Sequence, residues 1–190
     1  MKRTLKTLAA VAVSLTSFAQ QDAQFSHNMF NKLAINPGYA GTSRAICATA
    51  IYRNQWTGFD GAPRTFLFSG DASLAPLNLP LGVGLTVASD QLGFDKSFIG
   101  KLAVSYIMPL GPGTLGLGLE GGLQQKSLSG AWNAPETGTT NGADPTIPYD
   151  GATRSTWDLG FGAYYTTHQL YFGLSSLHLP QTSLKGITQY

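Results

Sequence analysis

The chain has 190 residues, of which 12% are charged and 43% are apolar, and its formal net charge is +2. When Lys2, Arg3 and Lys6 at the start are left out, the chain has nine basic and ten acidic residues. This balance excludes the basic surface that nucleic-acid binding needs. No segment stays apolar over the roughly 20 residues of a membrane-spanning helix, so we expect the apolar surface to be spread along β-strands.

Residues 1–19 have the features of a secretory signal peptide. Basic residues precede an apolar run from Leu8 to Leu15, and small residues end the segment at Ser17 and Ala19. Export implies an oxidising compartment, but Cys47 is the only cysteine, so an intrachain disulfide is excluded. We interpret Cys47 as a small side chain within a strand.

The most specific pattern lies between residues 36 and 65. It combines Asn-Pro-Gly-Tyr-Ala-Gly at 36–41, Tyr-Arg-Asn-Gln-Trp at 52–56 and Gly-Ala-Pro-Arg-Thr at 61–65. Turn formation explains the prolines and glycines but not the Tyr, Arg, Gln and Trp that accompany them. This order resembles the start of the PorP/SprF proteins, outer-membrane β-barrels of the type IX secretion system of Bacteroidetes, with Gly38 where that pattern usually has Ala. The matching residues are Asn36, Pro37, Tyr39, Ala40, Gly41, Tyr52, Arg53, Gln55, Trp56, Gly58, Gly61, Ala62, Pro63 and Thr65.

The resemblance implies a non-enzymatic component of the type IX secretion and gliding machinery in the cell outer membrane. Such a protein helps to secrete specific cargo proteins or to attach them to the surface. Its implied partners are membrane lipid, a periplasmic ring lipoprotein and ring subunits, a peptidoglycan-linked OmpA-like protein and secreted surface proteins. Family members are barrels of about fourteen strands, within the range of outer-membrane barrels.

Seven segments after Arg44 alternate with period two, which is typical of strands with one apolar face. They cover residues 46–52, 66–74, 81–87, 98–108, 115–123, 157–165 and 170–174. About ten alternating residues cross the hydrocarbon when the strand is tilted. The pattern predicts an all-β fold, a transmembrane antiparallel up-and-down β-barrel. A soluble β-sandwich shows similar alternation.

The faces opposite the apolar rows carry polar residues that we expect to face a wet lumen, because charges toward lipid are costly. They are Arg53, Asp71, Lys101, Glu120, Gln124 and Asp158. We further expect Arg53 to anchor the first loop by pairing with a carboxylate. Aromatic residues near the segment ends predict the interfacial girdles of a barrel, at Tyr52, Trp56, Tyr106, Trp157, Tyr164 and Tyr165.

The connections are expected to alternate in length. Those at 54–64 and 127–154 are long and that at 90–97 is intermediate, whereas those at 76–80, 109–113 and 167–169 are short. All the longer connections would then lie on one rim, which in outer-membrane barrels is the extracellular one.

Residues that resemble catalytic or cofactor sites are better explained by structure. Residues 116–121 match the Gly-x-Gly-x-x-Gly pattern of dinucleotide sites, but the glycines alternate with leucines inside one strand, so we interpret them as small inward-facing residues. His27, His168 and His178 lack metal-ligand spacing, and no nucleophile elbow or acid/base pair is recognisable. We expect no catalytic residue, metal or cofactor.

Seven strands leave two edges, and in lipid each unpaired backbone group costs several kcal/mol. We therefore expect residues 44–190 to be the N-terminal part of a larger barrel, in a fragment or a truncated gene product, after a periplasmic, plug-like lead-in at 20–43. Closure by two copies is the other possibility. Two further functions stay open at this point, a general porin-like outer-membrane channel and a soluble secreted β-sandwich.

Overall fold

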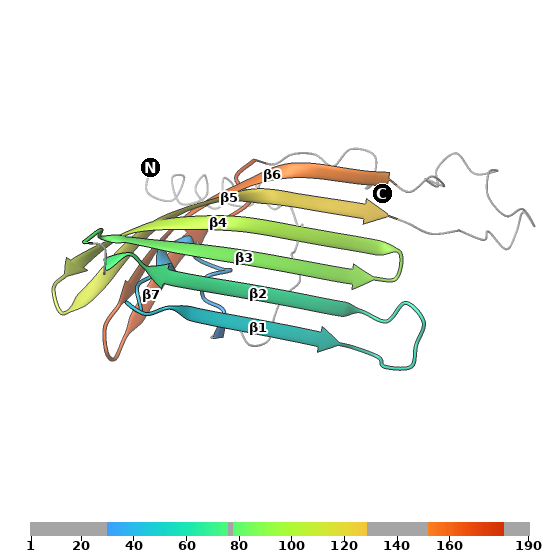
Figure 1. Cartoon of the computed structure of the whole chain (residues 1–190), viewed down its shortest axis with the longest axis horizontal. Coiled ribbons are helices and arrows are strands. Elements are labelled where there is room, and N and C mark those ends of the chain that lie inside the picture. Colours follow the sequence, from blue (N-terminus) through green and yellow to red (C-terminus); the bar gives the residue numbers. More distant parts are fainter. Residues whose placement is uncertain (1–29, 76–77, 129–151, 181–190) are drawn as a thin grey trace, which may run out of the picture.

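The computed structural model describes residues 30–75, 78–128 and 152–180, and these form one curled antiparallel sheet (Figure 1). Each strand pairs with its neighbours in the chain, in the order β1 to β7. The strands are β1 Cys47–Asn54, β2 Arg64–Ser73, β3 Leu81–Leu92, β4 Asp95–Leu110, β5 Gly113–Leu128, β6 Ala152–Thr166 and β7 Tyr171–Ser176, and a short 3-10 helix, η2, covers Pro37–Tyr39. The prediction of an all-β, up-and-down antiparallel fold is confirmed as a half-barrel.

The expected alternation of connection lengths is wrong in one place. β3 and β4 pair up to Leu92 and Asp95, so their connection is a two-residue turn at Gly93 and Phe94 and not an intermediate loop. Gly93 has a φ of 58°, which suits a tight hairpin turn that most residues cannot form. The rim with the β1–β2 connection, residues 55–63, thus also carries this short turn, whereas the β2–β3 connection, residues 74–80, lies on the other rim. The connection between β5 and β6 lies outside the described residues.

The outer face of the sheet is apolar and exposed. Leu102 and Leu119 are 65% and 69% exposed. Soluble monomers rarely expose large contiguous apolar patches. Along β4 the apolar outer positions run from Phe98 to Met108, which at about 3.3 Å per residue and a tilt of about 40° span roughly 25 Å, the height of the apolar band of outer-membrane barrels. No helix among the described residues is long and apolar enough to cross a membrane.

Aromatic residues lie at both ends of this outer face, with one exception to the prediction. Tyr52 is 65% exposed near one end, and Tyr106 is 49% exposed near the other. Tyr164, expected in a girdle, is only 4% exposed and points to the concave side. The error has a simple reason, because neighbours in a strand face opposite sides and Tyr165 already takes the outer position.

The core lies on the concave side of the sheet and is small. Residues 30–43, which we call the inner strap, pack against this side, and Leu33, Ala40 and Ala103 form the apolar cluster beneath Tyr39. Most other buried side chains there are polar. Asn31, for example, accepts a hydrogen bond from Ser69 (2.8 Å). The interior is therefore joined mainly by hydrogen bonds and close backbone packing.

Candidate functional site

Asn36 attaches the inner strap to the last two strands of the sheet. The Asn36 side chain accepts a hydrogen bond from Gly38 N (2.9 Å), which caps η2. Its amide donates to the Ala163 carbonyl of β6 (2.9 Å) and to the Leu174 carbonyl of β7 (3.3 Å). One buried asparagine therefore shapes the strap and holds it to two strands.

Four glycines let the strap reach the backbone of the sheet. These cradle glycines are Gly82, Gly116, Gly118 and Gly162, and a Cβ added at any of them would overlap atoms of residues 36–40. The predicted inward position is thus confirmed for Gly116 and Gly118, whereas Gly121 pairs with Leu102 on the outer face. The absence of a side chain at the cradle glycines is what the close approach requires.

Gly38 completes this contact from the strap. A Cβ at Gly38 would lie 2.7 Å from the Gly116 carbonyl oxygen and 2.9 Å from that of Gly162. Real Cβ atoms do not approach so closely, so an Ala at position 38 would force strap and sheet apart. The departure from the usual pattern therefore has a structural role in this chain.

The strap also attaches to β2 and β4, through Gly41 and Ala40. Gly41 N donates to Asp71 Oδ2 of β2 (2.9 Å), and Ser105 of β4 donates to the Ala40 carbonyl. Gly41 has a φ of 68°, a conformation that favours glycine. Together with Asn36, these contacts join β2, β4, β6 and β7 through residues 36–41.

Tyrosines surround a lysine of the strap. The Tyr39 ring meets Tyr164 edge-on at 5.2 Å between centroids, and Tyr164 stacks on Tyr171 at 6.1 Å. Lys32 Nζ lies 4.4 Å from the Tyr171 centroid, within cation–π range. Burial, followed by the nearby Asp71 carboxylate, raises the pKa of Tyr39, so its phenol stays neutral.

A buried ionic cluster lies beside the strap. Lys101 Nζ is 3.1 Å from Glu120 Oε1 and 2.8 Å from Asp158 Oδ2, and all three side chains are at most 7% exposed. His178 Nδ1 is 2.9 Å from the same Asp158 oxygen. The structure thus brings together three of the six predicted lumen residues.

Sequence reasoning missed the position of His178 because a β-bulge creates it. The ladder of β6 and β7 ends at Phe161 and Ser176, yet Leu179 N bonds to Leu159 O (2.9 Å), one residue out of register. His178 has a φ of 55° at this point. A bulge redirects a side chain, and here it turns His178 toward Asp158. Its place just after the expected last strand was the only sequence signal.

The remaining predicted lumen residues lie elsewhere on the same face. Asp71 holds the strap, whereas Gln124 and Arg53 are half-buried nearer the connection between β1 and β2. Arg53 Nη2 donates to Gln55 Oε1 (2.7 Å), so the guanidinium contacts the start of that connection through an amide.

The second half of the sequence pattern builds the connection between β1 and β2. Gln55 N bonds to Pro63 O (3.0 Å) and closes it, and Gly58 and Gly61 have φ values of 95° and 80°. Trp56 is 70% exposed, whereas Ala62 is buried. Thr65 Oγ1 donates to Asp90 Oδ1 (2.6 Å) and ties β2 to β3. The sequence pattern at 36–65 therefore contributes to two separate places in the fold, the inner strap and the β1–β2 connection.

Nothing among the described residues forms a group of three or more His, Cys, Asp or Glu side chains that could bind a metal. The charged groups of the cluster pair with one another. The arrangement packs the inner strap against the concave side of the sheet.

A curled antiparallel sheet with an apolar exterior and a polar, strap-filled interior defines the class of β-barrel membrane proteins. The family model described as type IX secretion system membrane protein PorP/SprF matches residues 17–190, and the chain belongs to this family. The protein is thus a membrane component of type IX secretion. No curated protein and no solved structure matches the chain.

Proposed function

We propose that this protein is a non-enzymatic outer-membrane barrel component that helps the type IX machinery to secrete specific cargo or attach it to the cell surface, including gliding adhesins. The family match over residues 17–190 carries the proposal. The exposed apolar band supports the location, because its estimated height suits an outer membrane. The implied partners are a periplasmic ring lipoprotein and ring subunits, a peptidoglycan-linked OmpA-like protein, and the cargo itself.

The edges of the sheet support the proposal that residues 44–190 form part of a larger barrel. Residues 20–43 are proposed as its periplasmic, plug-like lead-in. β1 and β7 have no outer strand partner among the described residues. Because seven strands alternate in direction, β1 and β7 run the same way. Two copies with the same orientation in the membrane would pair β1 of one copy with β7 of the other as parallel strands. A barrel in which every pair is antiparallel needs an odd number of further strands. In lipid either closure relieves the unpaired edges.

Gene deletion with complementation tests the function. The deletion strain should lose secretion or surface attachment of type IX cargo, and the wild-type chain, recovered in the outer-membrane fraction, should restore it. Leu119→Arg, within the apolar band, should fail to accumulate there, because arginine near the midplane costs about 2–4 kcal/mol. Gln125→Arg is the matched control at the polar end of the same strand face, where the cost is about 0–1 kcal/mol. Normal secretion by the deletion strain, or a water-soluble protein, would contradict the proposal.

A general porin-like channel is the second candidate, favoured by the polar concave face. Planar bilayer recordings distinguish it, since a channel conducts ions and its deletion leaves protein secretion intact. The inner strap fills part of that interior, so a channel should conduct more strongly when the strap is displaced.

A further inference from the structure

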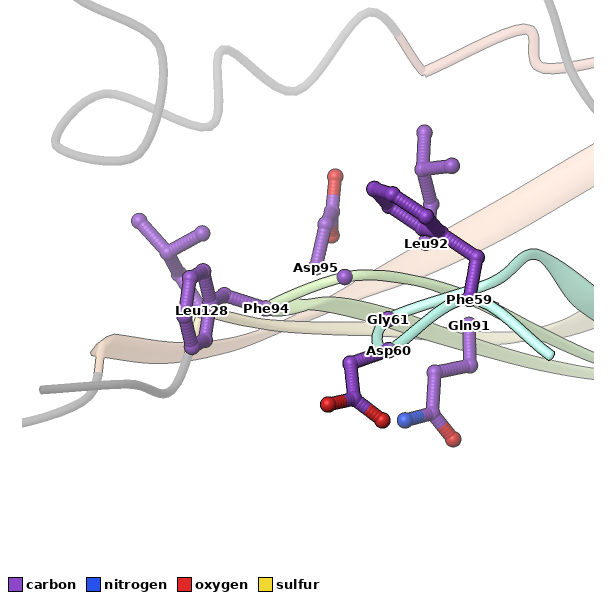
Figure 2. A pocket seen from close by; sticks show the side chains of 9 residues that line it. Phe59, Asp60, Gly61, Gln91, Leu92, Phe94, Asp95 and Leu128 are labelled. Atoms are coloured by element: carbon purple, nitrogen blue, oxygen red, sulfur yellow. The ribbon is translucent and has the colours of Figure 1, made fainter.

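Two cations lie on the outer face of the sheet, at the rim of the β1–β2 connection. Arg64 of β2 pairs with Gln91 of β3, and Gln91 pairs with Lys96 of β4, so the three residues form one cross-strand row, which we call the cation row. Figure 2 shows Gln91 on the opposite side of the ribbons from Leu92 and Asp95. Because residues directly opposite each other in a sheet share a face, Arg64 and Lys96 point outward with Gln91. Both cations are exposed.

The charge of the cation row is not balanced by the protein. Arg64 and Lys96 are the only charged side chains at outer positions of the described strands, and the row continues through the uncharged Asn54 and Ser127. Asp60 of the β1–β2 connection lies on the same side of the ribbons (Figure 2). Neither cation forms an ion pair with it or with any other described carboxylate. Two positive charges are therefore available to an external anion.

The level of the cation row in the membrane follows from the strand geometry. Lys96 is the next outer position after Phe98, where the apolar band of β4 begins. Two residues of about 3.3 Å each, at a tilt of about 40°, place the row about 5 Å beyond the band. The headgroup layer of a bilayer extends about 5–7 Å beyond the hydrocarbon on each side. The position of the row therefore puts it among lipid headgroups, whatever its charge.

The outer positions next to the cation row, toward the middle of the band, suit an acyl chain. Phe66 pairs with Ser89, and Ser89 pairs with Phe98, so a small side chain lies between two exposed rings. In the following row Val87 pairs with Gly100, which has no side chain. An apolar chain that runs along β3 would therefore contact both rings and end at the two cations.

The two ends of the outer face differ in charge and in their connections. At the end opposite the cation row the described strands carry neither lysine nor arginine, and Arg44 lies outside them, before β1. The two longest connections, residues 55–63 and 129–151, leave the strands at the rim of the cation row. Longer connections of outer-membrane barrels are extracellular. The connection lengths therefore favour the outer leaflet for the cation row.

We propose that the cation row binds the phosphate of a lipid headgroup in the outer leaflet, with an acyl chain of that lipid along β3 between Phe66 and Phe98. The Arg64 guanidinium can bind a phosphate through two hydrogen bonds, and Lys96 adds a compact positive charge. Their strands are two spacings apart, about 10 Å, so both long side chains can reach one headgroup. The choice of leaflet rests on the proposed outer-membrane location, whereas the row and its level rest on the geometry.

Native mass spectrometry of the full chain in a non-ionic detergent tests this proposal. The chain is titrated with lipid A, the phosphorylated glycolipid of outer leaflets, with dephosphorylated lipid A, with phosphatidylglycerol and with inorganic phosphate. Lipid A should bind at least tenfold more tightly than its dephosphorylated form or phosphatidylglycerol. The double variant Arg64→Gln, Lys96→Gln should bind lipid A at least tenfold more weakly, because each basic residue near the surface adds to the attraction for anionic lipid.

The double variant Lys126→Gln, Arg154→Gln is the matched control. It removes one lysine and one arginine from the same rim, at paired positions of β5 and β6 on the face toward the interior, and it should change lipid A binding by less than twofold. Resistance of Lys32 to trypsin verifies the fold of each variant. Lys96→Gln alone replaces the first double variant if that one misfolds, and it should weaken binding at least threefold.

Several results would overturn the proposal. Equal binding of the two forms of lipid A, or equal losses in the two double variants, would mean that the cation row does not recognise the phosphate. Tighter binding of phosphatidylglycerol that depends on Arg64 and Lys96 would assign the row to the periplasmic leaflet. Displacement of lipid A by an equal concentration of inorganic phosphate would assign it to the free anion.

The secretion assay separates this proposal from the proposed function. Normal secretion in the deletion strain with selective lipid A binding would remove the proposed function and leave the lipid site. Lost secretion without lipid A binding would do the reverse.

Discussion

The concave side of the sheet has two halves that use the same strands differently. Toward the β2–β3 and β4–β5 turns, glycines such as Gly116 and Gly118 let the inner strap touch the strand backbones. Toward the β1–β2 connection, Arg53, Gln124 and Lys126 keep full-length polar side chains and are only half-buried. Strand alternation is the same in both halves. The volume of the inward side chains therefore decides whether the interior packs or remains open to water.

The largest expected difference concerns two lysines in similar ion pairs. Lys101→Met should lower the free energy of unfolding by about 3–5 kcal/mol, because Glu120 and Asp158 would be left buried without their cation. Lys126→Met removes a pair with Asp95 that is 26% and 36% exposed in the open half, and it should cost at most about 1 kcal/mol. Urea unfolding in lipid vesicles measures both. Equal losses would mean that burial does not separate the two halves.

Gly118→Val should displace the inner strap from the packed half of the concave side, because the added side chain takes the space of the strap. The added side chain overlaps Pro37 and Gly38, and overpacking costs about 1–3 kcal/mol. The strap should leave the sheet, so trypsin should cut after Lys32, detected by mass spectrometry. Gly100→Val is the control on the outer face, where a Cβ meets only Phe98 at 3.7 Å. A protected Lys32 in Gly118→Val would show that the cradle tolerates a side chain.

Asn36→Ala should loosen the strap without overfilling its site. It removes the cap of η2 and the two bonds to β6 and β7, and we expect a loss of about 1–2 kcal/mol in unfolding free energy. Asn54→Ala, at the exposed end of β1, should change stability by less than about 0.5 kcal/mol. If the two variants behave alike in urea titrations, the Asn36 amide does not hold the strap.

The smallest effect is expected in the open half, at Arg53. Arg53→Ala removes the bond to Gln55 and should cost about 1 kcal/mol or less, seen as faster proteinase K cleavage within residues 55–63. Arg64→Ala, at the other end of this connection, serves as the control. Normal secretion and unchanged protease resistance would discard the anchoring role of Arg53.

Local patterns were sufficient to predict much of this protein. Alternation from Leu81 to Tyr165 predicted antiparallel strands with an apolar exterior, because side chains of a strand point to opposite faces whatever the partner is. The same alternation already implied that Tyr164 faces inward, and only its nearness to a segment end suggested otherwise. The pattern at 36–65 indicated the family that the comparison confirms.

Other features depend on contacts between residues far apart in the chain, which a local pattern does not contain. The fit of Gly38 against Gly116 and Gly162 needs three segments to meet. The pairing of His178 with Asp158 needs a bulge at the end of β7, and the division of the concave side into two halves needs the strap to fold back over the sheet. Strand pairing and register determine these contacts, and they arise only when the whole sheet has formed.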